Sequence, residues 1–373
     1  MTDQRLQNLA RILVRYSVGT KPGDHVAIRS VGAIAAALPL MELVFREVLK
    51  AGGHPHPLIF PGLTEEFDHI LYSVGSDEQL GQPDPVYDLM AHKFQCDVRI
   101  YSETNTRRLS RVDPTRAPMH FAAQSELMRL CRERSAKRDL RWVLTALPTA
   151  AYAQDSEMSL DEFEDFVYSA TFADQQDPAS AWSDIGATQS RLVEWLRGKK
   201  QVQVKGKHVD LEFSILGRSF ISCDGHQNMP DGEIFTGPVE NSVTGWLEST
   251  FPAIYRGVDV GKVAIRLKDG LVVQADAEKN QSHLTSLLDS DAGARRLGEF
   301  GIGTNDQIQT FTKNMLFDEK IGGTIHVALG AAYLETGASN ESVIHWDFLC
   351  DMRDGGQIIV DDTVFYDSGK FLV

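Results

Sequence analysis

The sequence predicts two folded regions: an N-terminal α/β domain, with a mostly parallel sheet and flanking helices, and a strand-rich α+β C-terminal domain. The chain has 373 residues, more than the ~250–300 that one hydrophobic core usually serves. Strand-like and helix-like segments alternate through roughly the first 150 residues, which is typical of a parallel sheet covered by helices. After Lys200, apolar and polar residues alternate with the period of a strand. We therefore predict one domain at residues 1–190 and a second at residues 191–373.

The N-terminal region begins with an amphipathic helix and continues with alternating strands and helices. The apolar stripe of the first helix consists of Leu6, Leu9, Ile12, Leu13 and Tyr16. The segments that follow are a strand at 26–28, a helix at 35–51, strands at 57–60 and 97–101, a helix at 119–137 and a strand at 142–147. Gly52 and Gly53 end the second helix, because glycine readily adopts the left-handed conformation found at helix C-termini. No Gly-x-Gly-x-x-Gly follows the first strand, so nothing here indicates a nucleotide site.

A helical, acidic stretch over residues 150–200 connects the two regions. Ser159 and Glu162 have the spacing of a capping box, which predicts a helix at 161–171. A second helix is expected at 179–199. In the C-terminal region, Lys268-Asp269-Gly270 separates two strand-like segments, and this pattern indicates a hairpin. Short strands at 358–361, 363–365 and 370–373 are expected to close the chain.

Composition and charge exclude several classes of partner. The chain carries 37 basic and 52 acidic residues, a formal charge of −15, whereas nucleic acids and anionic membranes bind basic surfaces. The longest apolar run, Val31–Phe45, contains Pro39 and Glu42, so we do not expect it to cross a membrane. The 4 cysteines are scattered, and the N-terminus has no apolar signal core. We therefore expect free thiols, a cytoplasmic location, and neither nucleic acid nor membrane as a partner.

His345 and Asp347 are the clearest candidates for chemistry. Residues i and i+2 of a strand point to the same face, so an imidazole and a carboxylate would converge there, as metal ligands must. Glu233 and Glu299 each lie among glycines and apolar residues, where a buried carboxylate needs a partner or a metal. His326 follows a glycine pair and adds a second imidazole. Each residue alone has an ordinary structural interpretation, but their occurrence within one domain favours a metal site.

Four stretches of the sequence resemble a known family. They are Gly-Glu-Ile-Phe-Thr from Gly232, Leu-Gly-Glu-Phe-Gly-Ile-Gly-Thr-Asn from Leu297, Phe-Asp-Glu-Lys-Ile-Gly-Gly-Thr-Ile-His-Val-Ala-Leu-Gly from Phe317, and His-Trp-Asp from His345. These stretches resemble the thermophilic-type metallo-aminopeptidases of peptidase family M29, and residues 13–23 resemble the start of that family. The likeness is strongest over residues 228–347 and weaker over residues 104–197.

The resemblance implies a metal site, residue by residue. It implies that the metal ligands are Glu233, Glu299, Glu319, His326, His345 and Asp347. It also implies that Tyr333 donates a hydrogen bond to the reacting carbonyl. Four carboxylates and two imidazoles exceed the ligands of one tetrahedral zinc ion and suit two ions that share a carboxylate. We expect two Zn²⁺, Co²⁺ or Mn²⁺ ions, a metal-activated water, and Glu299 as the bridge or the base. The resemblance alone implies a homodimer.

The expected activity is removal of N-terminal residues from peptides, and other activities remain open. The same fold serves ring-cleaving dioxygenases of the dihydroxypyridine type, which hold one Fe(II) ion. Those enzymes carry a histidine where this chain has Glu299 and an apolar residue where it has Glu233, and two histidines with one carboxylate mark their chemistry. An amidase acting on a small non-peptide amide is a second alternative. A binding protein that keeps metal for structure alone is a third. The connection at residues 334–344 is short and lacks the acidic insertion of many family members, so the resemblance does not define the substrate entrance.

Overall fold

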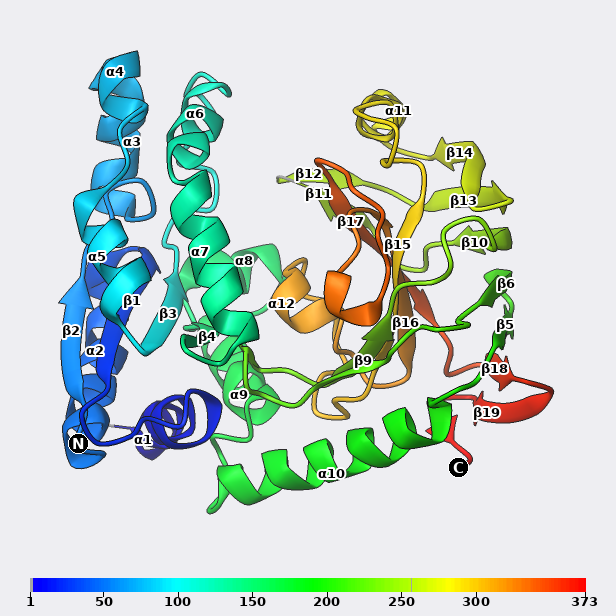
Figure 1. Cartoon of the computed structure of the whole chain (residues 1–373), viewed down its shortest axis with the longest axis horizontal. Helices are drawn as coiled ribbons and strands as arrows, with labels where there is room; N and C mark the ends of the chain where they lie inside the picture. The colour runs from blue at the N-terminus through cyan, green and yellow to red at the C-terminus, as the bar shows by residue number, and fades with distance from the viewer. Residues whose placement is uncertain (1–2, 256) are drawn as a thin grey trace. The chain divides into compact units, whose positions relative to one another are not determined.

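The computed structural model describes residues 3–255 and 257–373 (Figure 1). These residues form two compact units. Unit 1 comprises the described residues up to Trp182 together with Gly225–Pro230. Unit 2 comprises the described residues of Ser183–Asp224 and Asp231–Val373. The chain passes from unit 1 to unit 2 within helix α10 (Pro178–Leu196). The domain boundary at residue 190 stays a prediction.

Unit 1 is built on a five-stranded sheet in the order β2-β1-β3-β4-β8, in which every neighbouring pair is parallel. Its strands are β1 (His25–Gly32), β2 (His54–Leu58), β3 (Cys96–Ser102), β4 (Arg141–Ala146) and β8 (Asn228–Met229). Its helices are α1 (Gln4–Arg11), the π-helix η1 (Ile12–Ser17), α2 (Ile34–Lys50), α3 (Glu65–Val74), α4 (Asp77–Leu80), α5 (Pro85–Lys93), α6 (Arg116–Ala123), α7 (Ser125–Ala136), α8 (Ala150–Asp155) and α9 (Leu160–Ala170). None of the helices in the described part of the chain is long and apolar enough to cross a membrane.

Two elements of unit 1 differ from the prediction. The strand expected at 57–60 is observed as β2, three residues earlier, at His54–Leu58. Its two prolines lack an N–H group and are tolerated because β2 is an edge strand that pairs with β1 alone. The helix expected at 119–137 is divided into α6 and α7 at Gln124. The buried Gln124 side chain bonds the main chain of Gln82 and Asp84, a tertiary contact that local periodicity does not reveal.

Unit 2 contains two larger antiparallel sheets and a two-stranded sheet of β11 and β12. The eight-stranded sheet has the order β14-β13-β10-β6-β5-β18-β19-β20, and the five-stranded sheet has the order β17-β16-β15-β9-β7. The strands are β5 (Gln201–Gly206), β6 (Val209–Ser214), β7 (Ile221–Cys223), β9 (Glu233–Thr236), β10 (Thr244–Glu248), β11 (Ala253–Tyr255), β12 (Val258–Val260), β13 (Val263–Lys268), β14 (Leu271–Ala277), β15 (Leu297–Gly303), β16 (Thr324–Gly330), β17 (His345–Asp351), β18 (Gln357–Val360), β19 (Thr363–Asp367) and β20 (Lys370–Phe371). The helical segments are α11 (Gln281–Leu288), α12 (Met315–Asp318) and the 3₁₀ turn η2 (Leu334–Thr336).

Side chains from both large sheets join one hydrophobic core in unit 2. The ring of Phe213, from the eight-stranded sheet, lies 5.0 Å from the ring of Phe300 in the five-stranded sheet. The predicted hairpin joins β13 to β14, and its residues Asp269 and Gly270 have φ of 50° and 77°, as a type I′ turn requires. A parallel α/β unit and a strand-rich unit are therefore both present, and the predicted fold class is confirmed.

A buried ion pair links β1 to β3 at the centre of unit 1. Arg29 donates from Nε and Nη2 to the two Asp97 carboxylate oxygens, at 2.8 and 2.7 Å, and Arg99 Nε donates to Asp97 at 2.7 Å. Burial raises the pKa of Asp97, but the two guanidinium groups outweigh burial and lower that pKa to about 2. Because the folded-state pKa is depressed, the contribution of Asp97 to stability is complete above about pH 4. It is lost as the pH falls through about 2.

Asp97→Asn is expected to lower the unfolding free energy by about 3–5 kcal/mol at pH 7, because the buried Arg29 charge loses its counter-charge. Urea unfolding of both proteins at pH 7, 5 and 3.5 measures the difference, which should stay constant down to about pH 4 and then begin to shrink. Asp77→Asn is the matched control, since Asp77 pairs with Arg116 but its side chain is 76% exposed. Its expected cost is about 0–1 kcal/mol. Equal costs for the two variants would contradict the prediction.

Candidate metal centre

The candidate residues lie on neighbouring strands of the five-stranded sheet of unit 2. Glu233 begins β9, Glu299 lies in β15, His326 lies in β16, and His345 and Asp347 lie in β17. Strands β9, β15, β16 and β17 are adjacent and antiparallel. Because side chains alternate between the two faces of a sheet, the register of these strands decides which candidates meet.

A small residue lies opposite each candidate on the neighbouring strand. The pairs are Gly303–Glu233, Gly301–His326, Gly330–His345, Ala328–Glu299 and Ala328–Asp347. A Cβ atom on Gly301 would overlap the imidazole of His326. The small residues therefore leave room on this face of the sheet for the long polar side chains of their neighbours.

Five side chains form a row in which imidazole nitrogens and carboxylate oxygens alternate. Glu233 Oε2 lies 3.1 Å from His326 Nε2, which lies 3.6 Å from Glu299 Oε1. The second Glu299 oxygen, Oε2, lies 3.1 Å from His345 Nε2, which lies 3.8 Å from Asp347 Oδ1. Glu299 thus contributes one carboxylate oxygen to each half of the row.

The row contains two groups of three residues that could each hold one ion. Glu233, Glu299 and His326 form the first group, and Glu299, His345 and Asp347 form the second; ligand atoms within a group lie within 4.8 Å of one another. Two ligand atoms ~2.0–2.2 Å from one tetrahedral ion lie ~3.3–3.6 Å apart, close to the spacing in the row. Asp347 Oδ1 is buried and has no hydrogen-bond partner among the described residues, and Glu233 Oε2 is buried with its ion pair to His326. The donor set therefore fits divalent cations.

The charges of Glu233, Glu299, His326 and His345 hold one another in their ionised forms, whereas burial, together with the charges of Glu299 and Glu233, raises the pKa of Asp347. Burial raises the pKa of Glu299, but His326 and His345 outweigh burial and lower it to about 2. For Glu233, Lys320 and His326 likewise outweigh burial and lower the pKa. Burial lowers the pKa of both histidines, but the carboxylates beside them raise that of His345 to about 10 and that of His326 well above its usual value. The carboxylates therefore draw positive charge into a buried site.

The main chain fixes the orientation of the His345 ring. Its Nδ1 lies 2.8 Å from the carbonyl oxygen of Ala331, an acceptor, so Nδ1 carries a proton in this hydrogen bond. In the neutral ring, Nε2 then has its lone pair free and faces Glu299 and Asp347. This arrangement is common for metal-binding histidines, in which a second hydrogen bond sets the tautomer.

Tyr333 lies just beyond the end of β16 and is 43% exposed. Its ring centroid lies 5.2 Å from those of Phe235 and His345, so both rings orient it. Partial burial, followed by the charges of Glu299 and other nearby carboxylates, raises the pKa of Tyr333. The phenol therefore keeps its proton at neutral pH and can donate a hydrogen bond. Phe235, which contacts it, was not among the predicted site residues.

Glu319 lies outside both groups of three. It directly follows α12, and its carboxylate contacts Nζ of Lys320. Burial raises the pKa of Glu319 to about 8, and the charge of Lys320 offsets only part of that effect. The metal-ligand role of Glu319 stays a prediction.

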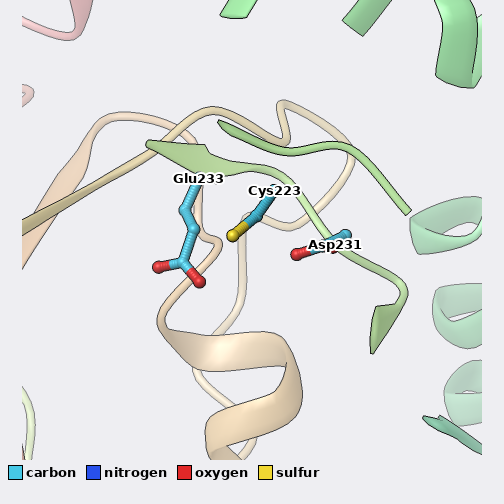
Figure 2. Close-up of side chains that lie close together, drawn as sticks. All are labelled: Cys223, Asp231 and Glu233. Atoms are coloured by element: carbon cyan, nitrogen blue, oxygen red, sulfur yellow. The ribbon is translucent and has the colours of Figure 1, made fainter. Parts of the chain in front are cut away.

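Sequence reasoning missed three residues beside Glu233: Lys320, Cys223 and Asp231. Lys320 is wholly buried, and its Nζ lies 3.5 Å from Glu233 Oε1. Figure 2 shows Cys223, at the end of β7, and Asp231, just before β9, next to Glu233. Burial raises the pKa of the Cys223 thiol well above its usual value. The one available signal was a lysine that follows Asp318 and Glu319 and directly precedes an apolar, glycine-rich stretch, because a lysine buried in such a stretch needs counter-charges.

Comparisons with known proteins cover nearly the whole chain. A family model described as thermophilic metalloprotease (M29) matches residues 2–371. Aminopeptidase 2 of Geobacillus stearothermophilus is 27% identical over 94% of this chain and 93% of its own length. Aminopeptidase T of Thermus thermophilus is 25% identical over 93% of this chain and 92% of its own length. The family resemblance stated from the motifs is confirmed.

Two solved structures share the fold. The wild-type AmpT structure from Thermus thermophilus matches with a TM-score of 0.84 at 22% identity, over 99% of both chains. The 2,5-dihydroxypyridine dioxygenase structure from Pseudomonas putida matches with a TM-score of 0.61 at 12% identity, over 99% of this chain and 97% of the other. At these identities the likeness concerns the fold alone, so the site residues must decide between the two chemistries.

Gly301→Ala is expected to displace the His326 ring and to weaken metal binding by about 10–100-fold, the usual effect of disturbing a ligand's support. Metal content after dialysis, with circular dichroism to check the fold, measures the effect. Gly206→Ala is the control, since it also changes a strand glycine of unit 2, and an added Cβ there would lie 3.4 Å from its nearest neighbour. Full metal retention in Gly301→Ala would show that the close approach of Gly301 to His326 is irrelevant to binding.

Proposed function

The chain belongs to the M29 family of thermophilic metalloproteases, and on this premise we propose that it is an aminopeptidase with a dinuclear metal site. The observation that carries the proposal is the division of the site into two groups of three ligands that share Glu299. The relatives named as aminopeptidases, each matched over more than nine-tenths of its length, support the same activity.

Five residues would hold the two ions: Glu233, Glu299, His326, His345 and Asp347. Bound ions would lower the pKa of a coordinated water and polarise the scissile carbonyl. The ligand set combines imidazole with carboxylate and suits Zn²⁺, Co²⁺ or Mn²⁺. Glu319 remains a possible sixth ligand in this proposal, provided that its carboxylate leaves Lys320.

The side chains of the site have separate roles in peptide hydrolysis. Glu299 is ionised at neutral pH, so its carboxylate can bridge the ions or accept the proton of the attacking water. Tyr333 keeps its phenolic proton and donates a hydrogen bond to the carbonyl oxygen as negative charge develops there. Removal of terminal residues, as opposed to internal cleavage, is supported by the relatives named as aminopeptidases.

The charge of the site argues against the oxygenase alternative. A mononuclear Fe(II) oxygenase is marked by two histidines and one carboxylate, whereas this row has three carboxylates beside its two imidazoles. Glu233 and Glu299 occupy the positions at which the two chemistries are expected to differ. Hydrolysis of a small non-peptide amide by the same site is the remaining alternative, because the reacting bond is chemically the same.

Two further properties belong to this proposal. The chain is a homodimer, which is supported by the large apolar side chains that unit 1 exposes on α2, α3 and α5, among them Leu49, Val74 and Leu89. The location is cytoplasmic, which is supported by four free, buried cysteines.

Protein purified without chelator is expected to contain about two Zn²⁺, Co²⁺ or Mn²⁺ ions per chain. Glu299→Ala should lose at least one ion and all hydrolysis of aminoacyl anilides, because it removes the shared ligand. Glu212→Ala, an exposed glutamate of β6, is the control and should keep both ions. Elemental analysis gives the counts. One iron per chain that survives Glu233→Ala and Glu299→Ala would overturn the peptidase and favour oxygen-dependent ring cleavage.

Tyr333→Phe is expected to lower kcat by about 10²–10³-fold with little change in KM, the usual cost of losing one hydrogen-bond donor to a developing oxyanion. Steady-state kinetics on an aminoacyl anilide and a metal count measure the effect, and the metal content should not change. Tyr366→Phe is the control, because this buried hydroxyl has no hydrogen-bond partner among the described residues. An unchanged kcat in Tyr333→Phe would remove the tyrosine from the mechanism.

A further inference from the structure

Lys320 is the residue of the site that metal ligation leaves unexplained. Its side chain is wholly buried, although an ammonium group is costly to bury without partners. Its main chain is held on both sides: the N–H donates to Phe317 O at 3.1 Å, and the C=O accepts from Asn305 N at 3.1 Å. Asn305 Nδ2 also donates to Asp231 O at 2.9 Å, so one residue ties the Lys320 loop to the Asp231 loop.

The Lys320 ammonium lies among carboxylates. Its Nζ contacts Glu319 Oε1 and lies 3.5 Å from Glu233 Oε1, and the charge of Asp231 also acts on it. Glu233 directs its other oxygen, Oε2, to His326 Nε2 at 3.1 Å. Glu233 therefore lies between two cation positions, the Lys320 ammonium on one side and the candidate ion group on the other.

A third group of ligand-type residues lies on the lysine side of Glu233. Cys223, Asp231 and Glu233 offer a thiol sulfur and two carboxylates within 4.8 Å of one another, enough for one ion (Figure 2). All three residues are buried. The lysine already supplies positive charge to Asp231 and Glu233, so an ion placed in this group would have to displace it or share its carboxylates.

We propose that Lys320 is a positioning residue that serves as a built-in cation. Its ammonium takes the cation position of the Cys223–Asp231–Glu233 group and fixes Glu233 with Oε2 facing His326. Metal ions are thereby confined to the row from Glu233 to Asp347, and the thiol of Cys223 is kept out of the ligand set. This inference rests on the proposed dinuclear function, which the metal count of the native chain tests separately.

The test removes the Lys320 ammonium and leaves space for a metal ion in its place. Lys320→Ala, loaded with Co²⁺, is expected to bind about one more ion per chain than the native protein and to show a thiolate-to-cobalt absorption band in the near ultraviolet. The double variant Lys320→Ala with Cys223→Ser should lose the band, and Lys320→Arg should keep the native count because it keeps the charge. A merely structural role for the lysine would produce no sulfur–metal band.

A second measurement keeps Lys320 and tests the inference even where Lys320→Ala does not fold. Cys223→Ser alone should leave the metal count unchanged, because the ammonium, not an ion, fills the group that contains Cys223. Loss of about one ion per chain from Cys223→Ser would overturn the inference. A folded Lys320→Ala protein with no added ion and no band, beside a native chain that holds two ions, would overturn it while leaving the dinuclear peptidase intact.

Discussion

The chemistry of unit 2 depends on keeping several carboxylates buried side by side. Glu233, Glu299 and Asp347 are 5%, 4% and 6% exposed, respectively, and like charges at this spacing repel strongly away from water. An imidazole lies between each pair of neighbouring carboxylates: His326 lies between Glu233 and Glu299, and His345 lies between Glu299 and Asp347. The lowered pKa of Glu299 and the raised pKa values of His326 and His345 follow from this alternation.

The antiparallel sheet supplies the positional accuracy that such a row needs. Each candidate ligand is anchored on a hydrogen-bonded strand whose neighbours fix its position and direction, which sites built on loops rarely match. Small residues on the opposing strands make the geometry possible. Gly301 is the clearest case, because its missing side chain leaves the space that the His326 imidazole occupies.

The sequence predicted what depends on local pattern and could not predict what depends on tertiary register. The two-residue spacing of His345 and Asp347 is enough to place both on one face of a strand. Bringing Glu233 opposite Gly303 requires the pairing of β9 with β15, strands far apart in the chain, and no local signal contains it. The division of the helix around Gln124 has the same cause, since it rests on contacts with distant main chain. Lys320 was overlooked because a lone lysine ordinarily indicates surface.

The location of the ligands on sheet strands has a consequence for how the protein matures. The backbone ladders joining β9, β15, β16 and β17 consist of main-chain hydrogen bonds, and the hydrophobic core of unit 2 consists of apolar side chains, none of them a candidate ligand. Folding and metal loading are therefore expected to be separate events, unlike those of small zinc domains that are unfolded without metal. We expect the chain to reach its final shape first and to acquire metal afterwards. Since raw affinity does not decide which divalent ion a site holds in the cell, we expect the metal supply where loading takes place to help decide which ion occupies the site.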